Sequence, residues 1–332
     1  MNAQRMVIIK KKGVASVKRI VIITGANSGI GKAAAFKFAS EGYRVIMACR
    51  NIKTSEAVHE ELIDRTKNTN IDLLQLDISS KQSIYSFCEM YKNKYGVLDI
   101  LIHNAGHFRH GEKRFQKSID GVELTFATNL FGPVLMTELL LDVLAKSNNP
   151  KILNVCSTNI KHFFDERRKI NFGVLSGEAI EDKQYNSYQI YGDSKMALLM
   201  ATTMMKQKYK PYNISVNAIM VPATKMSKET INKFNSYWKT LAFLQNLIIL
   251  EPETIGKAYF SICTSNVYTG ITGKLINHRG QIVKMADDSI SFIKIITSKE
   301  VYPPYVNNKE AIDKVWAVCK QYIENAKCSL LS

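Results

Sequence analysis

The chain has 332 residues, of which 46% are hydrophobic and 22% charged, and its formal charge at pH 7 is +16. This hydrophobic content is too high for a disordered protein. No run of about 18 apolar residues exists to form a conventional transmembrane helix. The six cysteines form no CxxC pair, which argues against a zinc site and a disulfide scaffold and fits a reducing compartment. We therefore expect a globular protein without a metal site.

The positive charge is concentrated near the N-terminus. Residues 1–40 hold eight Lys/Arg and no acid, since the first acidic residue is Glu41. The longest basic run is only three residues, Lys10 to Lys12. A solvated basic surface is the simplest interpretation, and contact with an anionic membrane or with nucleic acid is the alternative. We do not expect a nucleic-acid partner.

Short apolar runs alternate with helical patterns along the chain. Strands are predicted over residues 19–24, 44–49, 71–76, 98–103, 151–156, 214–221 and 271–276. Helices are predicted over about 32–40, 53–67, 80–95, 119–146 and 186–209. This alternation implies βαβ units with right-handed crossovers. The predicted fold class is therefore α/β, a Rossmann-type doubly wound parallel sheet of about seven strands with helices on both faces.

The expected organisation is one domain over residues 18–285, after a basic N-terminal extension (1–17) and before a C-terminal tail with a helix (286–332). Within the domain, residues 222–250 are interpreted as a variable substrate cover. Their many aromatic and aliphatic side chains suit a pocket for a lipid-like alcohol or ketone. Core packing, dimer contacts, or an interfacial patch that includes Phe292–Ile296 and takes substrate from a membrane remain alternatives.

A glycine-rich turn follows the first predicted strand and precedes the first predicted helix, which is where a dinucleotide site needs it. Gly25 allows the tight turn, Gly29 lets the backbone approach a pyrophosphate, and Gly31 lets the helix pack against the strand. The N–H groups of the helix N-terminus then face the phosphates. The candidate cofactor-binding residues of this turn are Gly25, Asn27, Ser28, Gly29, Ile30 and Gly31.

The end of the second strand bears on the choice of cofactor. An acid about 20 residues beyond the glycines would hold the ribose hydroxyls of NAD, but Arg50 and Asn51 stand at the strand end instead. A guanidinium can grip a 2′-phosphate through two charge-assisted hydrogen bonds. We therefore expect NADP(H) rather than NAD(H), with Lys32 as a further contact. The alternative is that Arg50 is a solvated strand-end residue.

A candidate acid–base pair lies on the helix after the fifth strand. Tyr191 and Lys195 are four residues apart, so both side chains fall on one helix face. A nearby ammonium should lower the pKa of the phenol, which is near 10 in water. Ser157, at the end of the fifth strand, can hydrogen-bond a substrate oxygen. The spacing alone is common in ordinary helices, and its place at the carboxyl edge of the sheet gives it weight.

Taken together, these pieces resemble the short-chain dehydrogenase/reductase family. The order Thr24-Gly25-x3-Gly29-x-Gly31, then Asp77, Asn104-Ala105-Gly106, Asn129, Ser157 and Tyr191-x3-Lys195 is that of the family. The resemblance implies an adenine contact at Asp77, a cofactor-packing segment at Asn104-Ala105-Gly106, and a catalytic tetrad. That tetrad is Asn129, Ser157, Tyr191 and Lys195, with Tyr191 and Lys195 also touching the cofactor. It further implies a homodimer.

The resemblance extends to the retinol-dehydrogenase-like branch. Residues 24–51, the stretch from Ile170 to Glu178 and the tail from Ala311 to Tyr322 are similar to segments of that branch. The branch is associated with NADP(H) and lipophilic substrates such as retinoids, isoprenoids or steroids. The implied function is an NADP(H)-dependent oxidoreductase that interconverts alcohol and carbonyl groups by hydride transfer. The alternative is a non-catalytic dinucleotide-binding or scaffold protein on the same fold.

Several residues depart from the family pattern. Pro222, a candidate cofactor contact, is followed by Ala223 where the family has Gly, so the loop is strained if that position needs a positive φ. His103 is interpreted as a packing residue and Cys156 as a small buried hydrophobe. The charged run at residues 165–169, inside a long Ser157-to-Tyr191 connection, is interpreted as a solvated loop.

Location is the least constrained property. The N-terminal segment contains too short an apolar run for a signal peptide or an anchor. Its basic, acid-free composition leaves a mitochondrial presequence open. We expect a cytoplasmic protein or a peripheral one on an intracellular membrane.

Overall fold

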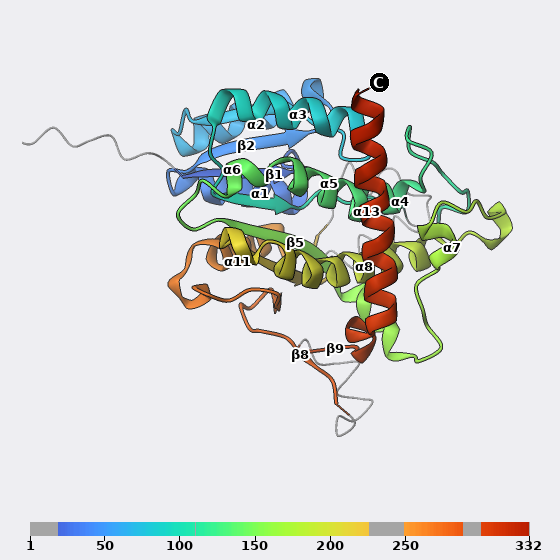
Figure 1. The fold of residues 1–332 in the computed structure, drawn as a ribbon. Helices are drawn as coiled ribbons and strands as arrows, with labels where there is room; N and C mark the ends of the chain where they lie inside the picture. The colour runs from blue at the N-terminus through green and yellow to red at the C-terminus, as the bar shows by residue number, and fades with distance from the viewer. Residues whose placement is uncertain (1–18, 110, 226–248, 288–299, 332) are drawn as a thin grey trace, which may run out of the picture.

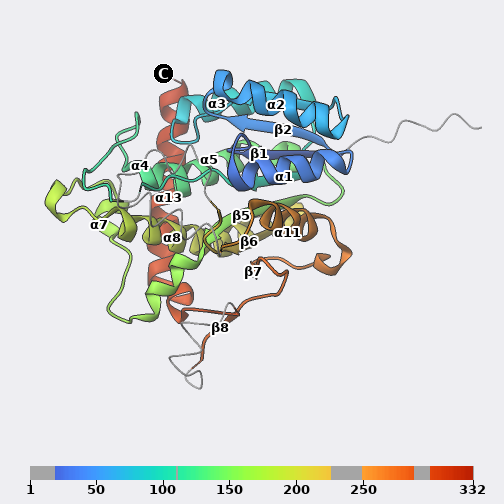
Figure 2. The same cartoon turned by 180° about the vertical axis from the view of Figure 1, so that it is seen from behind.

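Among the described residues, seven parallel strands form the central sheet, in the order β3-β2-β1-β4-β5-β6-β7 (Figures 1 and 2). The strands are β1 Ile20–Thr24, β2 Arg44–Cys49, β3 Ile71–Gln75, β4 Ile100–His103, β5 Lys151–Ser157, β6 Ser215–Val221 and β7 Leu275–Asn277. Most of their residues are buried because helices cover both faces, which is why they read as continuous apolar runs. The predicted fold class is confirmed.

The structure is a computed structural model that describes residues 19–109, 111–225, 249–287 and 300–331. The basic N-terminal extension, most of the proposed substrate cover and Phe292–Ile296 lie outside the described residues.

Two hydrophobic cores lie on the two faces of the sheet. Helices α1 Gly29–Ser40, α2 Ile52–Thr66 and α11 Pro252–Thr264 contribute to one core, and α1 packs along α11. Helices α3 Lys81–Tyr95, α5 Gly132–Leu139, α8 Ser187–Lys208 and α13 Lys309–Leu331 contribute to the other. Figure 1 shows α13, in red, running across this second layer, where it packs on α8 and α5. The tail helix therefore shares its core with the rest of the fold.

Short elements complete the chain. They are α4 Leu124–Phe126, a π-helical turn η1 Ala127–Phe131, α6 Leu141–Leu144 and α7 Phe172–Leu175, with 3₁₀ turns η2 Thr158–Phe164, η3 Asp182–Gln184, η4 Lys210–Tyr212, η5 Asn266–Tyr268 and η6 Pro304–Asn307. Strands β8 Lys284–Met285 and β9 Val301–Tyr302 pair in parallel outside the main sheet.

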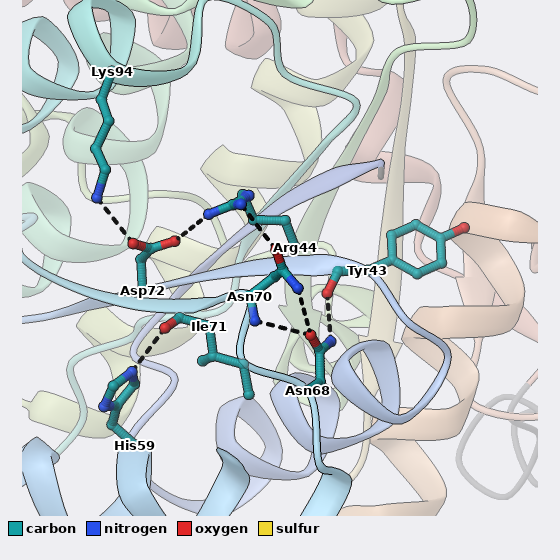
Figure 3. A network of polar contacts seen from close by, with 8 residues as sticks. All are labelled: Tyr43, Arg44, His59, Asn68, Asn70, Ile71, Asp72 and Lys94. Atoms are coloured by element: carbon teal, nitrogen blue, oxygen red, sulfur yellow. Dashed lines mark hydrogen bonds and ion pairs between the residues drawn. The ribbon is translucent and has the colours of Figure 1, made fainter. Parts of the chain in front are cut away.

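A polar network fixes the amino-terminal ends of β2 and β3, away from the carboxyl ends where ligands bind (Figure 3). The amide of buried Asn68 donates to the carbonyls of Ala39 and Tyr43, at 2.9 and 2.8 Å. Asp72 accepts hydrogen bonds from both Arg44 and Lys94, each at 2.9 Å. These bonds satisfy polar groups that the turn from α2 to β3 would otherwise bury without partners.

Two predicted elements differ from the structure, and one long helix of the structure was not predicted. The seventh strand is Leu275–Asn277 rather than 271–276, because Gly273 has φ +70° and turns the chain just before it. The expected helix at 119–146 is broken: Gly121 has φ +78°, and Leu140 leaves helical geometry at ψ 6°. Helix α11 was not predicted.

Candidate active site

A cleft of about 680 Å³ lies at the carboxyl ends of β1 to β4. Strand order reverses between β1 and β4, which is the position where open α/β sheets bind ligands. Its lining includes the candidate residues Gly25, Asn27, Ser28, Gly29, Ile30, Gly31, Arg50, Asn51, Asp77, Asn104, Ala105 and Gly106. The lining also includes Thr24, the first residue of the glycine-rich motif. Sequence reasoning missed the further lining residues Ala48, Thr54, Leu76, Ile78, His107, Thr128, Thr224 and Lys225.

The turn from β1 to α1 is built by close backbone packing. A Cβ on Gly31 would collide with the carbonyl oxygen of Gly25, so only glycine fits there. Gly29 has φ +50°, and a Cβ there would have nothing within 4 Å, which leaves its backbone open to the cleft. The Asn104 amide donates to the carbonyl of Thr24 at 2.9 Å and ties this turn to the end of β4. A glycine-rich cradle of this kind fits the pyrophosphate of a dinucleotide.

Arg50 and Asn51 lie at the end of β2 on the rim of the cleft. Arg50 is exposed, and Asn51 caps α2 by accepting the backbone N–H of Thr54 at 3.2 Å. Lys32 instead pairs with Glu61 at 2.6 Å and is not part of the cleft lining. Of the two predicted cofactor cations, Arg50 therefore lies in the cleft lining and Lys32 does not.

Asp77 follows β3 and has a fixed orientation. Its Oδ1 accepts hydrogen bonds from the backbone N–H and the hydroxyl of Ser79, at 2.9 and 2.6 Å. The carboxylate forms part of the cleft wall.

Asn129 lies buried in the π-helical turn η1, a kind of local widening that is frequent at functional sites. Its side chain makes two hydrogen bonds with the backbone of His107. Asn129 Oδ1 accepts the His107 N–H at 2.7 Å, and Nδ2 donates to the His107 carbonyl at 3.1 Å. The same Nδ2 donates to the hydroxyl of Ser194 on α8 at 2.9 Å. Asn129 thus joins the loop after β4 to the helix that carries Tyr191 and Lys195.

Tyr191, Ser157 and Lys195 come together next to the cleft, on the side of its lining residue Gly106. The Ser157 side chain lies close enough to the Tyr191 hydroxyl to act on the pKa of the phenol, which it lowers. The Lys195 ammonium lies 5.8 Å from the centre of the Tyr191 ring and donates to the carbonyl of Val155 at 2.8 Å. A Cβ on Gly106 would lie 3.6 Å from the Lys195 ammonium and 3.4 Å from Asn129 Oδ1, so the cleft reaches this group.

Burial shifts the pKa values of Tyr191 and Lys195 in opposite directions. Burial raises the pKa of Tyr191 to about 12, against the lowering effect of Ser157. Burial also lowers the pKa of Lys195 to about 8. The expected lowering of the phenol pKa by Lys195 is therefore wrong for this arrangement. Burial raises this pKa, and the ammonium of Lys195 donates to a backbone carbonyl instead.

The aromatic ring of Phe108 stacks on Tyr191, with centroids 4.5 Å apart. Phe108 also lies 6.0 Å from Tyr188, whose hydroxyl is 3.1 Å from His162 Nε2. These side chains form an aromatic cluster beside Tyr191, which no motif in the sequence indicated.

The charged run at residues 165–169 is not uniformly a solvated loop. Arg167 is exposed, as expected, but Arg168 turns inward and forms an ion pair with Asp193, which is fully buried on α8. Sequence spacing gave no signal for this contact because its partners are 25 residues apart in the chain.

The residues that depart from the family pattern fit the fold without strained backbone. Ala223 is not among the residues with positive φ, so its side chain causes no strain. Pro222 is half-buried and outside the cleft lining, while Thr224 and Lys225 just after it take part. His103 and Cys156 are buried packing residues: burial lowers the pKa of His103 to about 3 and raises that of Cys156 to about 12.

Membrane spans and metal clusters are both absent from the described part of the chain. None of its helices is both long enough and apolar enough to cross a bilayer. Within the same residues, no group of three or more His, Cys, Asp or Glu side chains is arranged to hold a metal ion.

Comparison with known proteins agrees with this geometry. The short chain dehydrogenase family matches residues 19–165. Retinol dehydrogenase 12 of Mus musculus is 35% identical over 259 residues, covering 74% of this chain and 78% of its own length. Retinol dehydrogenase 13 of Homo sapiens is 30% identical over 259 residues, covering 77% of this chain and 75% of its own.

A solved short chain dehydrogenase from Shigella flexneri, complexed with NADP, shares the fold with a TM-score of 0.60 at 19% identity. The alignment covers 79% of this chain and 97% of that one. The fold and the site define a nicotinamide-dinucleotide-binding oxidoreductase. The chain belongs to the short-chain dehydrogenase/reductase family, in its retinol-dehydrogenase-like branch.

Proposed function

We propose that this chain uses NADP(H) to interconvert an alcohol and a carbonyl group on a lipophilic substrate of retinoid, isoprenoid or steroid type. The observation that carries the proposal is the convergence of Tyr191, Ser157, Lys195 and Asn129 next to the glycine-lined cleft. The relatives named as retinol dehydrogenases support the substrate class. The exposed guanidinium of Arg50 on the cleft rim supports the choice of NADP(H).

The chain's own residues supply the proton and hold the substrate oxygen. The nicotinamide ring, when bound, gives or accepts the hydride. Tyr191 is a neutral phenol at pH 7, because burial raises its pKa to about 12, and a neutral phenol can donate a proton to a carbonyl oxygen. Ser157 donates a second hydrogen bond to that oxygen. Lys195 connects α8 to the sheet through the carbonyl of Val155, and Asn129 holds the loop after β4 through the backbone of His107.

The glycine-lined cleft suits the dinucleotide. The pyrophosphate would lie against the backbone of Gly29, whose Cβ position is open, and against the N-terminus of α1. Asp77 would contact the adenine, Asn104 to Gly106 would pack beside the cofactor, and Pro222 would lie near the nicotinamide.

Cofactor, substrate and catalysis can be tested together in one screen. We expect turnover with NADPH in preference to NADH against retinoid, isoprenoid or steroid carbonyls. Tyr191→Phe removes the proton donor, and kcat should fall about 100-fold or more while the protein stays folded. Full turnover by Tyr191→Phe would contradict the mechanism.

The second candidate is a non-catalytic dinucleotide-binding protein on the same fold. Cofactor binding without turnover across the panel would favour it. The Pro222-Ala223 departure that motivated this alternative lends it little support, because Ala223 has an ordinary backbone conformation. We further propose a location in the cytoplasm or on the surface of an intracellular membrane, and a homodimer; both remain predictions.

A further inference from the structure

A buried ion pair connects the long Ser157-to-Tyr191 segment to the helix that carries the acid–base pair. Arg168 lies in that segment and Asp193 on α8, and their side chains form an ion pair. Only 17% of the Arg168 side chain and none of the Asp193 side chain are exposed. Ion pairs this deeply buried require further hydrogen bonds to satisfy both charges.

Both charged groups have those additional partners. The second carboxylate oxygen of Asp193 accepts the backbone N–H of Asn171 at 3.0 Å. The guanidinium of Arg168 also donates to the carbonyl of Gln189 at 3.0 Å, and it lies 4.6 Å from the ring centre of Phe163. The Arg168 side chain therefore contacts two successive turns of α8. One contact is with a backbone carbonyl of the helix, and the other is with the side chain of Asp193.

The neighbouring residue Arg167 provides a contrast within the same loop. Its side chain is 91% exposed and pairs with the exposed Asp165. An exposed pair of this kind contributes little to structure. The two arginines have the same chemistry and adjacent positions, so their different environments isolate the effect of the buried contact.

Asp193 lies between the two residues of the acid–base pair. Its neighbour Ser194 accepts a hydrogen bond from Asn129 at 2.9 Å and donates to the carbonyl of Tyr191 at 2.8 Å. Lys195 donates to Val155 on the sheet at 2.8 Å. The turn from Tyr191 to Lys195 is thus held from the η1 side, from the sheet, and from the Ser157-to-Tyr191 segment through Arg168.

We propose that Arg168 and Asp193 are positioning residues that hold this turn of α8 in the geometry needed for proton transfer by Tyr191. The proposal rests on the proposed function for its catalytic consequence. Neither side chain is among the residues lining the cleft, so the pair acts through the helix and not by contact with the cofactor. Removing one partner leaves the other charge buried without its counter-ion.

The central experiment compares Arg168→Met with Arg167→Met. Displacing a reacting group by about 1 Å can cost about 100-fold in rate. We expect kcat of Arg168→Met to fall by roughly that factor, with the dissociation constant for NADPH changed by less than about twofold. Arg167→Met should keep the parent kcat. Arg168→Lys keeps the charge and should restore part of the rate.

A double variant separates positioning from simple loss of stability. Arg168→Met together with Asp193→Asn leaves no unpaired charge, so it should fold better than Arg168→Met alone while kcat remains low. Recovery of the full parent kcat by the double variant would overturn the proposal. An Arg168→Met protein whose kcat equals that of Arg167→Met would do the same.

Amide hydrogen exchange gives a readout that is independent of turnover. Residues 187–195 should exchange faster in Arg168→Met than in the parent or in Arg167→Met, with β1 and β2 unchanged. If the parent shows no turnover with any substrate, the proposed function fails, and this exchange pattern still decides whether the pair holds α8. Unchanged exchange at residues 187–195 would contradict the proposal.

Discussion

Lys195 should make the stability of the protein depend on pH above neutrality. Burial lowers its pKa in the folded protein to about 8, against 10.5 for a free lysine. Between these values the unfolded chain binds a proton that the folded protein has released, so the free energy of unfolding rises with pH. Below about pH 8 the cost of burying the ammonium is present in full.

The variant Lys195→Met removes this titration. As the pH is raised from 8 to 10, we expect the free energy of unfolding of the parent to increase relative to that of Lys195→Met. Urea unfolding of both proteins at several pH values measures the difference, and the other titrating groups cancel in the comparison. A difference that stays constant over this range would show that the folded-state pKa of Lys195 is not lowered.

The proposed preference for NADPH rests on Arg50. If Arg50 makes the proposed charge-assisted contact to the 2′-phosphate, replacing it with Ala should raise the dissociation constant for NADPH about 10- to 100-fold. Affinity for NADH, which lacks this phosphate, should change little. Fluorescence titration with each cofactor measures both constants.

Lys32→Met is the matched control, because Lys32 is also a cation near the first helix but is paired with Glu61 and lies outside the cleft lining. It should leave NADPH affinity within about twofold of the parent. Equal losses in Lys32→Met and Arg50→Ala would indicate a general effect of charge and contradict a specific phosphate contact.

At the scale of elements, the sequence was informative wherever local pattern decides structure. The strand–turn–helix unit around Gly25 and Gly31 was predictable, because apolar periodicity and glycine spacing are both local signals. Ser157 was placed by its position at the end of a predicted strand, whereas Asn129 was placed only through the family resemblance. The structure then brings both of them near Tyr191 by packing η1 and β5 against α8.

Elements decided by distant contacts could not be predicted in the same way. The π-helical turn at Ala127–Phe131 replaces the middle of an expected helix, and its Asn129 bonds to residues on a loop and on α8. The inward turn of Arg168 depends on a carboxylate 25 residues later. Pattern reasoning instead predicts a solvated loop there, because five consecutive charged residues are usually exposed.

At the scale of the whole molecule, α13 joins the C-terminal segment to the core beside α8. Trp316, Cys319 and Tyr322 are buried on one side of this helix. The Tyr322 ring stacks on Phe131 of η1 with centroids 4.7 Å apart. Lys208 of α8 lies 5.7 Å from the ring centre of Trp316 and pairs with Glu138 of α5. These contacts predict that the tail helix and the dinucleotide-binding sheet unfold together.

Trp316→Ala tests this cooperativity. Loss of a large buried side chain should lower the free energy of unfolding by about 3 kcal/mol. If α13 is part of the core, far-ultraviolet circular dichroism should show one urea transition at a lower midpoint. Lys320→Ala, at an exposed position on the same helix, should leave the midpoint unchanged. A Trp316→Ala protein that loses helix signal in a separate early step, with the main midpoint unchanged, would instead make residues 286–332 an independent tail.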